Sequence, residues 1–231
     1  VVSGIEHHAV LLEAQRLEAE GAVVHYVPVS RDGVVDLGAL KHMVGPRTAL
    51  VSVMYANNET GVIQPVKQVA EIAHKAGARF HCDAVQAFGK VELKPREIGC
   101  DLMSLASAKF GGPKGMGLLY NQMNSRLVPV IVGGPQEWGL RAGTEDLPGM
   151  AAMAAAMEIA ERERLAAWGG VAKVRDDLEK RLVEGLGANV RLNGAHAPRL
   201  PNVSNISFLH IEGQAMAIEL GEQGYCVGLG S

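Results

Sequence analysis

Three groups of polar residues, each able to take part in catalysis, directly follow three apolar, strand-like runs. The run 48–54 leads to Asn57-Asn58, the run 78–82 to Asp83 and Gln86, and the run 101–106 to Lys109. A lysine amine can form a Schiff base with an aldehyde and then move protons. A carboxylate can keep a ring nitrogen protonated, so that the ring accepts electrons from a carbanion. Together these residues suit a pyridine-aldehyde cofactor.

Each residue also has a structural interpretation. Asp83 could cap a helix that begins at Ala84, and Lys109 could be a solvated loop residue. Polar residues after three successive strands favour the functional interpretation, because ligands of such α/β sheets bind beyond the carboxyl ends of the strands.

The elements that must position these residues alternate between helical and extended patterns up to Gly143. Such alternation predicts an α/β fold with a mainly parallel central sheet flanked by helices. Helices are predicted at 9–20, from Asp36 through 44, and at 66–76; strands are predicted at 22–28, 48–54, 78–82, 101–106 and 115–121.

The pattern changes in the last third of the chain. Helical periodicity covers 147–167 and 171–186, separated by Gly169-Gly170, and strand-like runs at 189–193 and 202–211 precede a helix at 213–223. We interpret residues 1–146 as a large cofactor-binding domain. Residues 147–231 are then a linker helix and part of a smaller α+β domain.

Composition and charge exclude several classes of function. The 231 residues are 48% hydrophobic and 20% charged, with a net charge of −3, which predicts no strong attraction to nucleic acid or to an anionic membrane. Cys82, Cys100 and Cys226 have no CxxC spacing, which predicts a reducing, cytoplasmic location and no metal site. The chain begins at Val1 without a basic leader, so we expect no signal peptide and expect the sequence to be a fragment.

Several motifs in order make the sequence recognisable. It resembles the cysteine desulfurases, pyridoxal-phosphate enzymes of the class V aminotransferase family, and most closely their housekeeping and nitrogen-fixation group. The motifs that carry the resemblance are Glu6-His7-His8-Ala9-Val10, Ala56-Asn57-Asn58-Glu59-Thr60-Gly61, His81-Cys82-Asp83-Ala84-Val85-Gln86, Lys109 with Gly112-Pro113-Lys114-Gly115, Gly133-Gly134-Pro135-Gln136-Glu137, Arg141-Ala142-Gly143-Thr144, Leu200-Pro201-Asn202 and Asn205-Ile206-Ser207-Phe208.

The resemblance implies fold type I of the pyridoxal-phosphate-dependent transferases and a role for each matching residue. Lys109 would hold the cofactor as a Schiff base, and His7 would stack on its ring and take part in acid–base chemistry. Asp83 would pair with the ring nitrogen and Gln86 with the ring hydroxyl. Asn58 would contact the Schiff-base side of the cofactor or the substrate carboxylate.

Other matching positions receive other roles. Thr144 would reach a phosphate oxygen in the site of a neighbouring subunit, which implies a homodimer, and Arg141 would brace the same loop. Lys114 matches a loop-stabilising position, Asn57 a structural one, and His8 a variable one that faces solvent.

The sequence departs from the family at the phosphate end of the site. The family has Ser-x-His-Lys where this chain has Ala106-Ser107-Ala108-Lys109. Two side chains that bond the phosphate are replaced by alanine, and each such bond contributes about 1.5–3 kcal/mol. We expect weaker cofactor binding unless Ser107 or backbone amides take over.

A second departure concerns the ends of the chain. The resemblance implies a preceding segment with a Gly-x-Thr phosphate loop, and a sulfur-handling cysteine in a loop that begins near Gly230-Ser231. Cys226 falls five residues before the cysteine position and Cys82 adjoins Asp83, so neither is a suitable substitute. We therefore expect the 231-residue chain alone to be inactive and prone to aggregation.

For the whole protein, the resemblance implies conversion of L-cysteine to L-alanine and an enzyme persulfide. The persulfide would pass to an iron–sulfur scaffold protein or to another sulfur acceptor. The alternatives are selenocysteine lyase and a non-catalytic homologue that acts as a binding or scaffold protein, which Ala106 and Ala108 favour. A further alternative is a generic sugar- or nucleotide-binding module. The absence of a glycine-rich dinucleotide fingerprint from the sequence argues against it.

Overall fold

A six-stranded sheet forms the larger part of the molecule. The computed structural model describes residues 1–122 and 127–230. The strand order is β2-β1-β3-β4-β5-β6, and all neighbouring pairs are parallel except β5 and β6. The strands are Val2–Ser3 (β1), Tyr26–Val27 (β2), Leu50–Ser52 (β3), Arg79–Asp83 (β4), Leu102–Ala106 (β5) and Gly117–Asn121 (β6). The predicted mainly parallel α/β sheet is confirmed.

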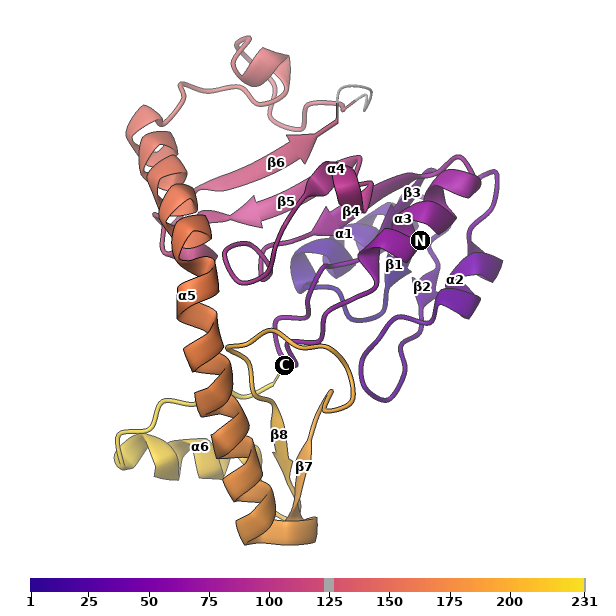
Figure 1. Ribbon diagram of the computed structural model, residues 1–231. Helices are drawn as coiled ribbons and strands as arrows, with labels where there is room; N and C mark the ends of the chain where they lie inside the picture. The colour runs from indigo at the N-terminus through magenta and orange to yellow at the C-terminus, as the bar shows by residue number, and fades with distance from the viewer. Residues whose placement is uncertain (123–126, 231) are drawn as a thin grey trace.

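The two faces of this sheet differ in character. Alternate residues such as Val51, Phe80 and Met103 are buried in the main hydrophobic core, because successive strand residues point to opposite faces. Figure 1 shows α3 (Val66–Lys75) and α4 (Pro95–Ile98) in front of the strands, α2 (Leu37–Met43) at the same side of the core, and α1 (His8–Ala19) behind.

The opposite face carries a polar row across three strands. His81 of β4 lies between Ser52 and Ser104, with 2.8 Å from Nδ1 to the Ser52 hydroxyl and 2.9 Å from Nε2 to the Ser104 hydroxyl. The row fixes the register of β3, β4 and β5 on the face that also carries Asp83.

The boundaries of the first helices follow local signals in the sequence. The Asp36 carboxylate accepts hydrogen bonds from the amides of Gly38 and Ala39, so α2 begins where the cap predicts. Gly21, beyond α1, has a φ of 96°, which glycine adopts readily. The strand predicted over 22–28 is reduced to Tyr26–Val27, and Val23 is exposed because the preceding residues run outside the sheet.

A single 40-residue helix, α5, runs from Leu147 to Leu186 (Figure 1). The break predicted at Gly169-Gly170 is therefore wrong. Each glycine inside a helix costs roughly 0.5–1 kcal/mol, which the alanine- and leucine-rich flanks can offset by continuing the helix. A β-carbon at either glycine would meet no atom within 4 Å, so this stretch lies in the open between the two sheets.

The second, smaller sheet lies at the far end of α5 (Figure 1). It pairs β7 (Val190–Leu192) with β8 (Ile206–Phe208) in antiparallel fashion, after the 3₁₀ turn η3 (Gly187–Asn189). Helix α6 (Gly213–Glu222) follows and is capped by Glu212. Residues 225–230, which follow α6, form neither helix nor strand. We propose the division into 1–146 and 147–231 on this layout.

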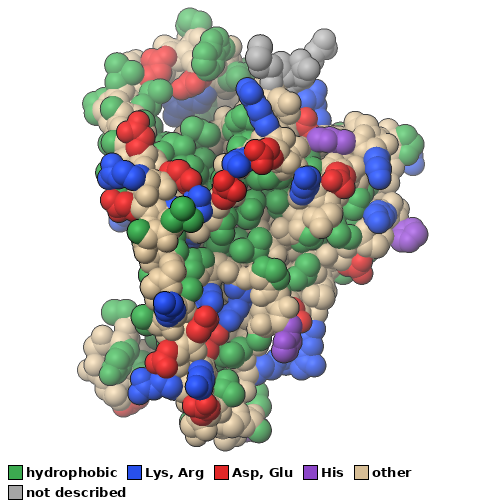
Figure 2. All heavy atoms as spheres, viewed as in Figure 1, with side chains coloured by type: hydrophobic (Ala, Val, Ile, Leu, Met, Phe, Trp, Pro, Cys, Tyr) green, Lys and Arg blue, Asp and Glu red, His purple; other side chains and the backbone are tan. Residues whose placement is uncertain are grey.

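Apolar side chains are exposed on the segment that joins β6 to α5. Val130 and Trp138 are each 93% exposed, the latter in the 3₁₀ turn η2 (Glu137–Gly139). The segment lies at the top of Figure 1, and Figure 2 shows hydrophobic side chains at the surface in the same part of the view. Surfaces of this kind favour association, in line with the aggregation expected of the isolated chain. That aggregation stays a prediction. Ser231, where the sulfur-handling loop is expected to begin, lies outside the described residues.

Candidate active site

Three neighbouring parallel strands deliver the predicted polar residues to one edge of the sheet. β3, β4 and β5 are adjacent in the sheet. Asn58 follows β3, Asp83 ends β4, and Lys109 lies in the 3₁₀ turn η1 (Ser107–Phe110) directly after β5. His7 follows β1, which pairs with β3 on the other side. The predicted convergence of the strand ends is present in the topology.

Asp83 is a nearly buried carboxylate with one oxygen available. Its side chain is 8% exposed, and Oδ1 accepts a hydrogen bond from the Val85 amide at 2.9 Å. Oδ2 has no hydrogen-bond partner within 1–122 and 127–230. A protonated ring nitrogen is a donor that would satisfy this oxygen.

His7 is held at the start of α1 with one ring nitrogen engaged. Nδ1 accepts a hydrogen bond from the Ala9 amide at 3.1 Å, so His7 caps the helix. The ring is exposed, which leaves its face and Nε2 available to a ligand. The neighbouring His8 is also exposed, in agreement with the solvent-facing role expected for it.

The two asparagines have different surroundings. The side-chain carbonyl oxygen of Asn57 accepts hydrogen bonds from the Glu59 amide and from the amide and hydroxyl of Thr60, and its side-chain amide donates to the Ile5 backbone carbonyl at 3.1 Å. These contacts agree with the structural role expected for Asn57. The Asn58 side chain makes no hydrogen bond to any described residue, so its amide group is free for a ligand.

Lys90 is a second lysine near Gln86 and Lys109 that the sequence did not indicate. Its ammonium donates to the Gln86 carbonyl at 2.8 Å and lies 3.4 Å from the Gln86 Oε1 atom. Burial, and next the charge of Lys109, lower the pKa of Lys90 to about 8. Lys90, Lys109, Phe110 and Trp168 line one open hollow. The only signal in the sequence is the four-residue spacing from Gln86.

The structure places Ser107 away from solvent. Its hydroxyl is buried with no partner among the described residues, and it packs where a β-carbon on Gly112 would meet it, next to Ala156 of α5. Ala106 and Ala108 flank it without polar side chains. The role of Ser107 in holding the cofactor phosphate stays a prediction. Its packing against α5 gives no support for that role.

The loop with Thr144 is exposed. Arg141 donates from Nη1 to the Ala142 carbonyl at 2.9 Å, which agrees with a bracing role. Thr144 is exposed and makes no side-chain hydrogen bond within the part of the chain that the structure describes. Its contact with a neighbouring subunit stays a prediction.

Glu6 is a buried carboxylate that sequence reasoning did not single out as a site residue. It is 5% exposed, and its Oε1 atom accepts hydrogen bonds from the Ser3 hydroxyl at 2.5 Å and from the Met54 amide at 2.6 Å. Its Oε2 atom is buried without a partner in the described residues. Burial raises the pKa of Glu6 from 4.5 to about 7, and the charge of Asp83 adds to the rise.

This raised pKa makes stability depend on pH in a defined direction. Between pH 4.5 and about 7 the folded state holds a proton that the unfolded chain releases, so the free energy of unfolding falls as pH rises through that window. A shift of this size corresponds to about 3 kcal/mol. In the full-length protein, Glu6→Gln should remove that fall, as measured by urea unfolding across the window.

The matched control is the exposed Glu13→Gln. The hydrogen bond from Arg16 lowers the pKa of Glu13, so its contribution is lost only in acid and the variant should keep the wild-type fall between pH 4.5 and about 7. If the free energy of unfolding changed with pH in the same way in the Glu6 variant and in the wild type, Glu6 would not be the group that binds the extra proton in the folded state.

The described residues contain no cluster of His, Cys, Asp or Glu side chains that could hold a metal ion. Within the same residues, no helix has the length and apolar character needed to cross a membrane.

Comparison with known proteins places the chain. The family profile described as "Aminotransferase class-V" matches residues 1–231. The chain belongs to the class V aminotransferase family. It is 40% identical over 231 residues to a cysteine desulfurase of Klebsiella pneumoniae, covering 100% of this chain and 58% of that relative. The chain therefore spans little more than half the length of the relative it matches.

Two solved structures superpose on this fold. A NifS-like protein from Rickettsia africae superposes with a TM-score of 0.92 at 29% identity, covering 100% of this chain and 63% of the other. SspA in complex with cysteine superposes with a TM-score of 0.79 at 29% identity, covering 96% and 60%. The fold expected from the resemblance is confirmed.

Proposed function

We propose that these 231 residues belong to a pyridoxal-phosphate-dependent cysteine desulfurase. The observation that carries the proposal is Asp83, a nearly buried carboxylate with a free oxygen, at a strand end between those that lead to Asn58 and Lys109. Support comes from 40% identity to a cysteine desulfurase and from the likeness to SspA, whose solved structure contains cysteine.

The residues present fit the ring end of pyridoxal phosphate. The free Oδ2 of Asp83 would take the ring nitrogen, His7 offers an exposed ring face, and Lys109 offers an amine. Gln86 would reach the ring hydroxyl, although its Oε1 atom lies near Lys90. The phosphate end has less to offer, because alanines replace two expected polar side chains. Pyridoxal phosphate, when bound, supplies an electron sink for the substrate α-carbon.

The residues of the chain would then divide the work. Asp83 would keep the proton on the ring nitrogen, and Lys109 would hold the cofactor and then move protons at the substrate α-carbon. Asn58 orients the amino-acid carboxylate. A thiolate from outside these residues takes the substrate sulfur, so that cysteine and an enzyme thiol give alanine and an enzyme persulfide.

The chain itself contains no suitable thiol for that last step among its described residues. Cys82 and Cys100 are fully buried, and burial raises the pKa of the Cys82 thiol further. Cys226 is exposed but lies in the 225–230 segment, ahead of the position that the family uses. Gly230 lies against Glu59, next to Asn58, so the chain returns to the site at this point.

Partners and location follow from the same proposal. We propose a homodimer through the Thr144 loop, a sulfur acceptor or iron–sulfur scaffold protein as the partner, and a cytoplasmic location.

The test uses the full-length protein, cofactor and L-cysteine. We expect alanine and enzyme-bound sulfur in equal amounts. Faster turnover of selenocysteine with no sulfur left on the enzyme would assign a selenocysteine lyase. Protein that stays colourless with pyridoxal phosphate would instead indicate a non-catalytic homologue, which Ala106 and Ala108 favour.

A further inference from the structure

The loop that carries Asn58 is hydrogen-bonded to a segment far away in the sequence. We call residues 57–62 the asparagine loop and residues 198–205 the backing segment. The Leu200 amide donates to the Gly61 carbonyl at 2.8 Å, and the Asn205 side chain donates to the Glu59 carbonyl at 3.2 Å. Next to the loop, the Ile63 amide donates to the Pro198 carbonyl at 2.8 Å. The position of the asparagine loop is thereby tied to the backing segment.

The two segments also fit closely against each other. Gly61 has a φ of 74°, and a β-carbon there would lie 2.7 Å from Cβ of Val203. No side chain fits at such a distance without a shift of its neighbour. A displacement of the backing segment would therefore be transmitted to the loop as well as to its hydrogen bonds.

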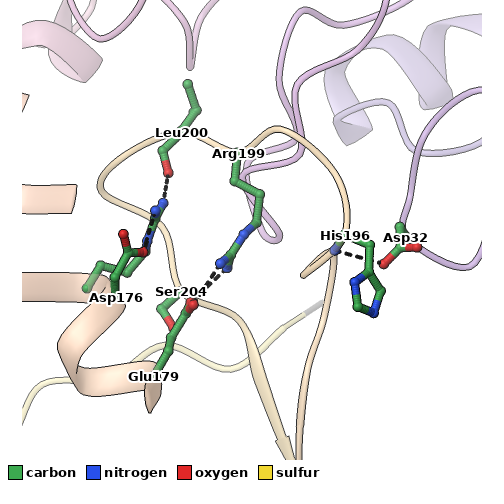
Figure 3. Close-up of polar contacts among 8 residues, drawn as sticks. Asp32, Asp176, Glu179, His196, Arg199, Leu200 and Ser204 are labelled. Carbon is green, nitrogen blue, oxygen red and sulfur yellow. Dashed lines mark hydrogen bonds and ion pairs between the residues drawn. The ribbon is translucent and has the colours of Figure 1, made fainter. Parts of the chain in front are cut away.

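A buried ionic cluster fixes the backing segment to α5 (Figure 3). Glu179, 4% exposed, accepts two hydrogen bonds of 2.7 Å from Nη1 and Nη2 of Arg199 and one of 2.8 Å from the Ser204 hydroxyl. Arg175, one turn earlier on α5, donates to the Leu200 carbonyl at 2.6 Å. We call these four side chains the Glu179 clamp.

The chemistry of the clamp suits precise positioning. Burial acts to raise the pKa of Glu179, but hydrogen bonds from Arg199 and Ser204 and the charge of Arg199 lower it overall, so the carboxylate stays ionised. A two-pronged arginine–carboxylate pair fixes direction as well as distance. Removal of one partner leaves the other charge buried and unpaired, so the arrangement resists partial opening.

We propose that Glu179 is a positioning residue for Asn58: it holds the backing segment, and the backing segment holds the asparagine loop at the substrate. Glu179 lies outside the site and touches no reacting group. The functional half of this inference rests on the proposed function, because Asn58 acts there on the amino-acid carboxylate.

The first test measures amide hydrogen exchange in the full-length protein without cofactor. Glu179→Gln preserves the shape of the side chain but removes its charge. We expect amides of the asparagine loop to exchange about tenfold faster, while those of Arg79–Asp83 keep their wild-type rates. Ser204→Ala, a milder change that removes one donor, should accelerate the same amides about threefold.

The matched control is Glu184→Gln, an exposed residue of the same helix in a 3.8 Å pair with Lys180. It should leave every rate unchanged. Equal rates in the asparagine loop for Glu179→Gln and wild type would overturn the proposal. So would a uniform acceleration across the sheet, because that would indicate general destabilisation.

A second readout connects the clamp to the site. Titration of cofactor-loaded protein with L-alanine, followed by visible absorption, should show about tenfold weaker binding in Glu179→Gln, with pyridoxal-phosphate affinity unchanged. Unchanged binding of L-alanine would overturn the functional half. Failure of the wild type to process cysteine would instead count against the proposed function alone, since the exchange result does not depend on turnover.

Discussion

Replacing Lys109 with alanine should abolish covalent attachment of pyridoxal phosphate in the full-length protein. The amine in the turn after β5 is the group expected to form the Schiff base. The same amine also moves protons, and loss of a positioned acid–base group costs roughly 10²–10⁴-fold in rate. The variant should lose its visible absorption after gel filtration and lose turnover of cysteine by at least that factor.

Lys114→Ala is the matched control, because Lys114 lies five residues later in the turn between η1 and β6. It should retain both colour and activity. Loss of colour in Lys114→Ala, with colour retained in Lys109→Ala, would move the attachment site to the other lysine. The same colour measurement on Lys90→Ala tests the second alternative lysine, since Lys90 lines the same hollow as Lys109.

Asp83→Asn should produce the second large effect. The amide is the same size as the carboxylate and can still accept the Val85 hydrogen bond, but it no longer stabilises a proton on a ring nitrogen. A hydrogen bond to a charged group contributes about 1.5–3 kcal/mol, which predicts cofactor binding weaker by at least tenfold. Turnover should fall further, because an unprotonated ring is a poorer electron sink.

Asp101→Asn provides the control. Asp101 directly precedes β5, whereas Asp83 is the last residue of β4, so the two carboxylates lie at opposite ends of neighbouring parallel strands. The Asp101 Oδ2 atom accepts one hydrogen bond from the Phe80 amide at 2.7 Å and lies 2.9 Å from Nε2 of His74, so its role is structural. We expect lower stability with normal cofactor affinity. If Asp83→Asn matched this outcome, with normal affinity and normal turnover, the assignment of Asp83 to the ring nitrogen would be wrong.

The positions of the candidate residues at the strand ends could be predicted from the sequence. Each of Asn58, Asp83 and Lys109 follows an apolar run, and parallel strands bring their carboxyl ends to one edge. The alternation of strands and helices was sufficient for this, although β2 and β3 are shorter than their apolar runs suggest. The roles of these residues stay predictions.

Other features depend on contacts between distant segments and left no local signal. The Glu6 carboxylate is buried where the Ser3 hydroxyl and the amide of Met54, 48 residues further along the chain, both donate to it. The Glu179 clamp joins α5 to a loop 20 and 25 residues further on. The continuity of α5 through Gly169-Gly170 has no signal in the sequence, because glycine pairs more often end helices than extend them.

The central claim is that Lys109 binds the cofactor beside Asp83. Borohydride reduction of the full-length protein loaded with pyridoxal phosphate, followed by peptide mass spectrometry, tests it most directly. We predict one reduced pyridoxyl adduct, on the peptide that contains Lys109. An adduct confined to Lys90 or Lys114, or no adduct at all, would contradict the account.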